Sequence, residues 1–148
     1  NLITSIKDNI NLLKELDSII EIKLSYSSDE IFFNSDNEQL SRVFFNLIKN
    51  SIESIQEKRT YEPNFKGKID IAIEDNDDYI VLSVIDNGKG FNELENNLKS
   101  ILNPYFTTKE KGTGLGLAIV NKIVNDHNGK IEFISLENGA KINVEFFR

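Results

Sequence analysis

The chain has 148 residues, 39% hydrophobic and 28% charged, as in an ordinary globular domain with its own core. It has no cysteine and one histidine, which excludes a disulfide framework, a thiolate metal site and a histidine-rich zinc site. A net charge of −7 argues against nucleic acid as a partner, but not against a small anion held by a few local donors. No apolar run approaches the roughly 20 residues that cross a bilayer, so we expect no direct membrane contact.

The first 16 residues follow a helical pattern, and the chain enters this pattern midway, without an initial methionine. The apolar positions of the pattern are Leu2, Ile6, Ile10 and Leu13. We expect residues 1–16 to be the tail of an upstream helix or linker. Residues 17–148 are then the domain proper, as a fragment of a longer protein.

Two strands and a long helix are expected next. Residues 20–26 alternate apolar and polar side chains, and a shorter strand is expected over residues 31–34. The helix covers about residues 35–58, with Ser35 or Asp36 as its N-cap. Its apolar stripe consists of Leu40, Phe44, Leu47, Ile48 and Ile55.

A polar loop over residues 59–67 leads to two further strands. These strands, over residues 68–74 and 79–86, are joined by a turn at residues 75–78. The second strand has apolar residues on both faces, which favours a central place in a sheet.

The last third of the chain is expected to add helices and a hairpin. A short helix over residues 92–102 is followed by a loop over 103–113 and a helix over Leu117–Asn125, capped by Gly129. A step of four residues marks the packed side of that helix: Leu115, Ile119, Ile123 and His127. A hairpin around Asn138–Gly139 closes the chain.

These elements mix strands and helices without a regular β-α-β alternation. They predict an α+β fold in two layers, a two-layer α/β sandwich. The sheet has about five strands, mixed but mostly antiparallel, and about three helices cover one of its faces.

The stretch "KGTGLGLAIV", residues 111–120, alternates glycines with other residues and then becomes apolar. It fits neither a P-loop nor the dinucleotide fingerprint, since the spacing differs and a loop precedes it. Flexible glycines that lead into a helix N-terminus favour a bound anion. A simple glycine-rich turn explains the stretch equally well, so the stretch alone does not decide.

A second cluster is "VIDNGKGF", residues 84–91. Asp86 ends the central strand and is followed by Gly88 and Gly90. A carboxylate in this place can accept a hydrogen bond from an exocyclic amine in a pocket. Taken alone, a turn is the better interpretation, because Asn-Gly is among the strongest turn dipeptides.

The long helix carries the third cluster. Asn46 and Asn50 are four residues apart and share a face with Glu53, away from the apolar stripe. The face is either solvated or a pair of amide oxygens at the rim of a pocket. Such oxygens suit a hard cation such as Mg²⁺.

In this order, the three clusters resemble the catalytic ATP-binding domain of sensor histidine kinases. That domain belongs to the Bergerat-fold (GHKL) family, which includes gyrase, Hsp90 and MutL. The resemblance covers about residues 20–148. The segment "PYFTTKE" is most similar to nitrogen-regulation (NtrY/NtrB-like) kinases.

The resemblance implies a site for ATP and Mg²⁺. Asn50 is the implied metal ligand, and Asn46 lies near the phosphates. Asp86 receives the adenine amino group, and Gly88 and Gly90 give the base room. The ATP lid and second glycine box supply the other implied nucleotide-binding residues: Phe106, Thr107, Thr108, Lys109, Gly112, Thr113, Gly114, Leu115, Gly116 and Leu117.

Two positions depart from relatives in this family. Asn46 stands where the hydrolysing members have a water-activating Glu, so we expect slow hydrolysis and transfer of the phosphoryl group to another acceptor. Glu53 stands where some histidine kinases carry a phosphate-binding Lys. The lone His127 continues an apolar ladder, so we expect it to be structural, and the fragment to contain no phosphoacceptor.

The resemblance implies a protein histidine kinase of two-component signalling, whose γ-phosphoryl acceptor is a histidine of a missing dimerisation domain. Its further partner is the cognate response regulator. We expect a cytoplasmic domain of a parent attached to the bacterial inner membrane. Two alternatives stay open, a serine kinase of the anti-sigma-factor type and a nucleotide-sensing interaction module without transfer.

Overall fold

The computed structural model describes residues 1–90 and 116–148. Within these ranges it contains three helices and five strands: α1 (Leu2–Lys14), β1 (Glu21–Tyr26), α2 (Asn37–Tyr61), β2 (Lys68–Asp75), β3 (Tyr79–Asp86), α3 (Gly116–Asp126), β4 (Lys130–Leu136) and β5 (Gly139–Phe147). None of these helices is both long and apolar enough to cross a membrane.

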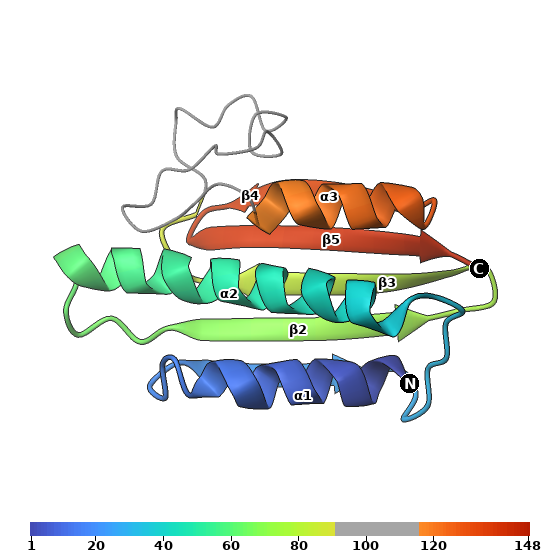
Figure 1. Ribbon diagram of the computed structural model, residues 1–148. Coiled ribbons are helices and arrows are strands. Elements are labelled where there is room, and N and C mark those ends of the chain that lie inside the picture. Colours follow the sequence, from blue (N-terminus) through green and yellow to red (C-terminus); the bar gives the residue numbers. More distant parts are fainter. Residues whose placement is uncertain (91–115) are drawn as a thin grey trace.

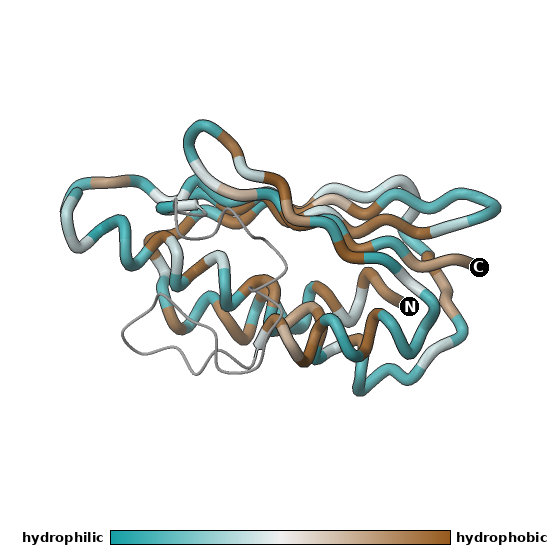
Figure 2. The backbone as a smooth tube through the Cα atoms, turned by 90° about the horizontal axis from the view of Figure 1, so that it is seen from above, coloured by the Kyte–Doolittle hydropathy of each residue, from teal (hydrophilic) through white to brown (hydrophobic). Residues whose placement is uncertain are grey.

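The five strands form one open sheet in the order β1-β2-β3-β5-β4. β1 pairs with β2 in parallel, and the other three pairs are antiparallel. All three helices lie on the same face of the sheet (Figure 1), and the view from above shows two distinct layers (Figure 2). The predicted two-layer α+β sandwich is confirmed, and β3 is the central strand, as expected.

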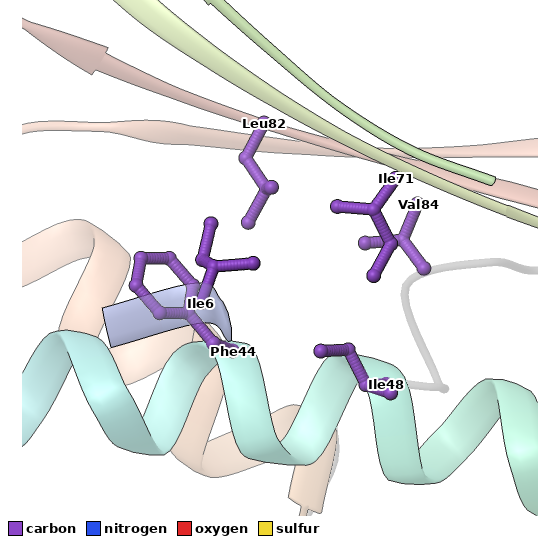
Figure 3. A pocket seen from close by; sticks show the side chains of 6 residues that line it. All are labelled: Ile6, Phe44, Ile48, Ile71, Leu82 and Val84. Carbon is purple, nitrogen blue, oxygen red and sulfur yellow. The ribbon is translucent and has the colours of Figure 1, made fainter. Parts of the chain in front are cut away.

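The core lies between the sheet and the helices. Ile6 of α1 and Phe44 and Ile48 of α2 point toward the sheet, and three side chains of β2 and β3 point back at them (Figure 3). The gap that they surround is apolar and too small to hold a water molecule. It is therefore a packing defect of a dry core, not a ligand site.

The long helix α2 provides the centre of the helical layer. Asp36 is its N-cap, and the carboxylate accepts hydrogen bonds from the amides of Glu38 and Gln39 at 2.9 and 3.2 Å. The five residues of the predicted apolar stripe are all buried. The helix ends at Tyr61, three residues later than predicted.

Helix α1 shares its core with the rest of the chain. Its apolar side is buried through Leu2, Ile3, Ile6, Ile10 and Leu13. The helical pattern expected in residues 1–16 is therefore confirmed, and the helix packs on the same sheet as α2 (Figure 1). The boundary at residue 16 stays a prediction about the longer protein.

One predicted strand is wrong. Residues 31–34 are not in the sheet, although Ile31 is fully buried. The carbonyl of Ile31 accepts a hydrogen bond from the amide of Leu2 at the start of α1. The apolar residues there reflect one buried side chain, Ile31, beneath the start of α1, and not a strand that pairs with a neighbour.

Helix α3 differs from its prediction in two details. Ile119 is 38% exposed, whereas Val120, Ile123 and Val124 are buried, so the packed stripe does not follow a step of four. The left-handed residue after the helix is Asn128, with φ of 56°, and not Gly129. The amide of Gly129 then donates to the carbonyl of Val124 at 2.8 Å, which completes a Schellman cap.

Candidate functional site

Asp86 is the last residue of the central strand, flanked in register by Ile69 of β2 and Ala140 of β5. It is 4% exposed and lies on the same side of β3 as Val84, toward the helices. Its Oδ1 accepts a hydrogen bond from the amide of Gly88 at 2.9 Å. A buried acceptor therefore stands at the end of the sheet, below the helical layer.

Gly88 presses the loop after β3 against α2. A Cβ at this residue would lie 2.5 Å from Oγ of Ser54 and within 2.8 Å of the backbone of Ser54 and Ile55. The amide of Lys89 donates to the carbonyl of Ser54 at 3.3 Å. Neither Asn87 nor Gly88 has a positive φ, so the close approach, not an Asn-Gly turn, requires glycine here.

Gly90 bounds the other side of this loop. Its φ is 73°, and a Cβ there would lie 2.7 Å from the carbonyl oxygen of Gly139 at the start of β5. Gly139, with φ of 143°, in turn lies directly against the carbonyl oxygen of Asp86. The segment Asp86–Gly90 is thus packed between α2 and the last hairpin.

Helix α2 aligns a row of polar side chains above this loop. Asn46, Asn50, Ser54 and Lys58 follow one another at four-residue intervals and share a face. Asn46 and Asn50 are half-buried, and Nδ2 of Asn46 donates to the carbonyl of Arg42 at 2.8 Å. The predicted asparagine pair therefore lies on the same helix face as the contact with Gly88.

The first residue of α3 meets this row. A Cβ on Gly116 would lie 3.1 Å from Oδ1 of Asn46, so the helix start and the amide oxygen are in direct contact. Leu117, the next residue, packs against the core. α2 and α3 lie side by side on the sheet (Figure 1). On α2 itself, Glu53 of the predicted polar face forms an ion pair with Lys49, with Nζ and Oε1 3.9 Å apart.

Among residues 1–90 and 116–148, no group of three or more His, Cys, Asp or Glu side chains could hold an ion. The polar row offers amide oxygens instead, from Asn46 and Asn50. Such a set fits a cation like Mg²⁺, which takes one or two protein oxygens and completes its shell with water and phosphate.

Of the predicted nucleotide residues, seven are described. They form two groups joined by α2: Asp86, Gly88 and Gly90 at the loop, and Asn46, Asn50, Gly116 and Leu117 toward α3. The others lie outside the described residues: Phe106, Thr107, Thr108, Lys109, Gly112, Thr113, Gly114 and Leu115.

The predicted structural role of His127 agrees with its surroundings. Its Nδ1 lies 2.8 Å from the carbonyl oxygen of Ile123, one turn back. The ring stands edge-on to Phe146 and tilted to Phe33, with centroids 6.2 and 6.4 Å away. The side chain therefore packs between α3 and the sheet.

Sequence reasoning missed the polar network that fixes the loop. Lys89 pairs with Glu57 of α2, with Nζ and Oε2 2.9 Å apart, and Nζ of Lys58 donates to the carbonyl of Asn87 at 3.4 Å. The side chain of Asn87 bonds to the backbone at the start of β2. In the sequence, this network could be suspected only from Glu57 and Lys58, which lie three and four residues after Ser54 and so share its helix face.

This geometry is that of a known family. Residues 35–147 match the family described as "Histidine kinase-, DNA gyrase B-, and HSP90-like ATPase". The chain therefore belongs to this family of ATPase-type, nucleotide-binding domains. Among its relatives within the family are sensor histidine kinases, as the following comparisons show.

Two curated relatives illustrate the similarity. Sporulation kinase A of Bacillus subtilis (strain 168) is 36% identical over 155 residues, which cover 96% of this chain and 24% of that protein. An NtrY-like sensor histidine kinase of Rickettsia felis is 37% identical over 147 residues, covering 98% and 23%. The chain thus spans about a quarter of the length of these relatives. The resemblance to NtrY-like kinases is confirmed, alongside other sensor kinases of similar identity.

Solved structures agree. The nucleotide-free catalytic domain of histidine kinase ThkA superposes with a TM-score of 0.84 at 31% identity, covering 99% of this chain and 92% of that one. ThkA in complex with the response regulator protein TrrA gives a TM-score of 0.78 at 28% identity, covering 99% and 40%. The fold is that of a histidine kinase catalytic domain.

Proposed function

We propose that this domain binds Mg²⁺–ATP and supplies the γ-phosphoryl group to a histidine on the dimerisation domain of a longer kinase. That histidine then phosphorylates a response regulator. The observation that carries the proposal is the buried Asp86 carboxylate, placed under the helix face that bears Asn50 and Asn46.

Asp86 would select the base. Its carboxylate is an acceptor and can receive the exocyclic amino group of adenine. The corresponding position of guanine is a carbonyl oxygen, which the carboxylate would repel. Gly88 and Gly90 let the loop pack closely against α2 and Gly139, which would hold the backbone beside this carboxylate in place. We therefore expect adenine nucleotides to bind more tightly than guanine nucleotides.

Asn46, Asn50 and the start of α3 would hold the phosphate end. Backbone amides in the first turn of a helix favour anions, and the first turn of α3 contains no acidic side chain. Asn50 would ligate Mg²⁺, with Asn46 beside the phosphates. The ion, when bound, would neutralise negative charge on the triphosphate.

The acceptor is expected to be protein and not water. Asn46 carries an amide, which cannot take a proton from an attacking water as a carboxylate does. His127 is held in the packing between α3 and β5, which supports a phosphoacceptor in another domain. ThkA has been solved with a response regulator, which supports a regulator as the second partner. The parent is proposed to be attached to the bacterial inner membrane, with this domain in the cytoplasm.

Calorimetric titration with ATP and GTP, with and without Mg²⁺, tests the site. We expect Asp86→Asn to lose most adenine affinity, and Asn50→Ala to lose the gain from Mg²⁺. Asp126→Asn and Asn125→Ala, on the exposed side of α3, are the matched controls and should bind as wild type. Wild-type affinity in Asp86→Asn would contradict the base assignment, and full Mg²⁺ dependence in Asn50→Ala the metal assignment.

The fate of the phosphoryl group needs the longer protein, incubated with γ-labelled ATP. Phosphohistidine is labile to acid, whereas phosphoserine is stable. Acid treatment of the labelled protein therefore distinguishes a histidine kinase from a serine kinase. Acid-stable label would support the serine kinase of the anti-sigma-factor type. Binding without any labelled protein would support a nucleotide-sensing module.

A further inference from the structure

The side chain of Asn87 occupies an unusual place, where the central strand stops and its neighbour begins. We infer that Asn87 is a positioning residue that fixes Asp86 for base recognition. Its side chain makes hydrogen bonds to the start of β2 that the backbone of a further β3 residue would otherwise make. The inference rests on the proposed function for its link to the base, but its structural part stands on the contacts below.

Asn87 continues the ladder between β2 and β3 by one step. The regular pairing ends at Ile69 and Asp86. Beyond it, the amide of Asn87 donates to the carbonyl of Lys68 at 3.3 Å. Its Oδ1 accepts from the amide of Lys68 at 2.7 Å, and its Nδ2 donates to the carbonyl of Lys66 at 3.1 Å. One residue thus satisfies three backbone groups at the start of β2.

A side chain is needed there because the backbone leaves the sheet. From Gly88 onward the chain runs against α2, where the amide of Lys89 bonds to the carbonyl of Ser54. A strand could not both continue along β2 and turn to α2. Asn87 resolves this conflict, since its backbone follows the loop while its side chain stays on the sheet.

The segment that Asn87 holds is itself fixed to α2. Gly67, between the two residues bonded by Asn87, is buried and lies directly against Ile55. Lys58 then closes the network, since its Nζ donates to the carbonyl of Asn87 and lies 4.3 Å from the ring centre of Phe65. Both sides of the Asn87 link therefore rest on the same helix.

The consequence concerns the residue before Asn87. The carboxylate of Asp86 is oriented from one side by the amide of Gly88, and the loop that carries this amide is tied to the sheet by Asn87. Without the side chain, the loop can slide along α2 and move the amide of Gly88 away from the carboxylate of Asp86, which stays in β3 between its two neighbouring strands. We expect the base end of the site to be affected and the phosphate end to be spared.

The test compares two asparagines at opposite ends of the β2–β3 pair. Oδ1 of Asn76 accepts from the amides of Asp78 and Tyr79, both at 3.0 Å, in the turn between these strands. Asn76→Ala therefore also removes side-chain hydrogen bonds from the hairpin, but far along the strands from Asp86. It is the matched control for Asn87→Ala, with a comparable loss of stability.

We expect Asn87→Ala to bind ATP, ADP and adenosine about tenfold more weakly than wild type, with a similar factor for each. The preference for adenine over guanine nucleotides should fall by a similar factor. Asn76→Ala should keep both affinity and preference. Asn87→Asp, which retains an acceptor for the amide of Lys68 but lacks the donor, should restore part of the affinity.

Amide hydrogen exchange in nucleotide-free protein provides a second readout. The amides of Gly88 and Lys68 should exchange at least about tenfold faster in Asn87→Ala than in Asn76→Ala. Unchanged exchange at Gly88 overturns the inference, whatever the binding data. Faster exchange with wild-type adenine affinity overturns its functional part. Should wild type bind no adenine nucleotide, the proposed function fails, while the exchange rates still decide whether Asn87 fixes Asp86.

Discussion

Gly116 and Asn46 are in direct contact where α3 begins: a Cβ on Gly116 would lie 3.1 Å from Oδ1 of Asn46. Asn46 cannot retreat freely, because its Nδ2 is bonded to the carbonyl of Arg42. The polar face of α2 and the first turn of α3 can therefore be this close only because Gly116 has no side chain.

The first prediction concerns this contact. Gly116→Ala should weaken Mg²⁺–ATP binding, because the new methyl group displaces Asn46 or the start of α3. Stability should change little, since the clash offsets the preference for Ala over Gly, which reaches about 1 kcal/mol only in a helix interior. Calorimetry and thermal unfolding measure the two effects separately. A loss of both in parallel would mean that the substitution simply unfolds the helix.

A second prediction concerns Gly88. Gly88→Ala should lower the free energy of unfolding by about 1–3 kcal/mol, because the methyl group would overlap the α2 backbone. Adenine binding should fall as the loop moves outward. Chemical denaturation and nucleotide titration measure these changes. Adding Ser54→Ala should not restore either property, since the backbone atoms remain; a full rescue would show that only the hydroxyl was in the way.

The third prediction concerns Asp17, which joins the α1–β1 connection to α2. Burial acts to raise the pKa of Asp17, but hydrogen bonds from Arg59 and Gln56, the charge of Arg59 and the amide of Ile19 outweigh it. The pKa of Asp17 therefore lies below its ordinary value. Arg59 Nη1 lies 2.7 Å from Oδ2 of Asp17, and the side chain of Asp17 is 6% exposed.

Because the folded-state pKa is lowered, the ionised carboxylate stabilises the fold above the unfolded pKa of about 4, and this contribution is lost as the pH falls through the lowered value. Asp17→Asn should cost about 1–3 kcal/mol at neutral pH. The difference from wild type should shrink in acid. Denaturation curves at several pH values test this. Asp126→Asn removes the exposed Lys122 pair and should change stability little; a pH-independent cost for Asp17→Asn would contradict the assignment.

Ser51 gives a fourth prediction. It is 1% exposed, and its Oγ has no hydrogen-bond partner among the described residues. Ser51→Ala should therefore raise the free energy of unfolding by about 1 kcal/mol, because a buried hydroxyl without a partner is costly. ATP affinity should not change, although Asn50 is adjacent. A loss of stability would mean that the hydroxyl has a partner in the remainder of the chain.

The fold was largely predictable because its periodic signals were strong. The alternation in residues 68–74, the apolar run in residues 79–86 and the stripe of α2 predicted the central strands and helix correctly. The exceptions depend on distant contacts. Ile31 is buried by the start of α1, so its segment imitates a strand without a neighbour. The parallel pairing of β1 with β2, across all of α2, likewise leaves no local pattern.

For the site, motif order predicted Asp86, Gly88 and the asparagine pair as nucleotide-binding residues, but it did not give the structural reason for each residue type. Asn87–Gly88 has the composition of a tight turn, yet the glycine is required by the backbone of Ser54 and the asparagine bonds to β2. These requirements arise only when α2 is packed on the sheet. No local pattern in the sequence could separate them from turn preference.

The contact between Gly90 and Gly139 joins segments that are about fifty residues apart in the chain. A side chain on Gly90 would meet Gly139, and one on Gly139 would meet the backbone of Asp86 and Asn87, so substitutions at the two positions should be non-additive. The hairpin between β4 and β5 is thereby a poor place for an inserted tag or a transplanted loop. Any change to that turn also changes the backbone that packs directly against Asp86.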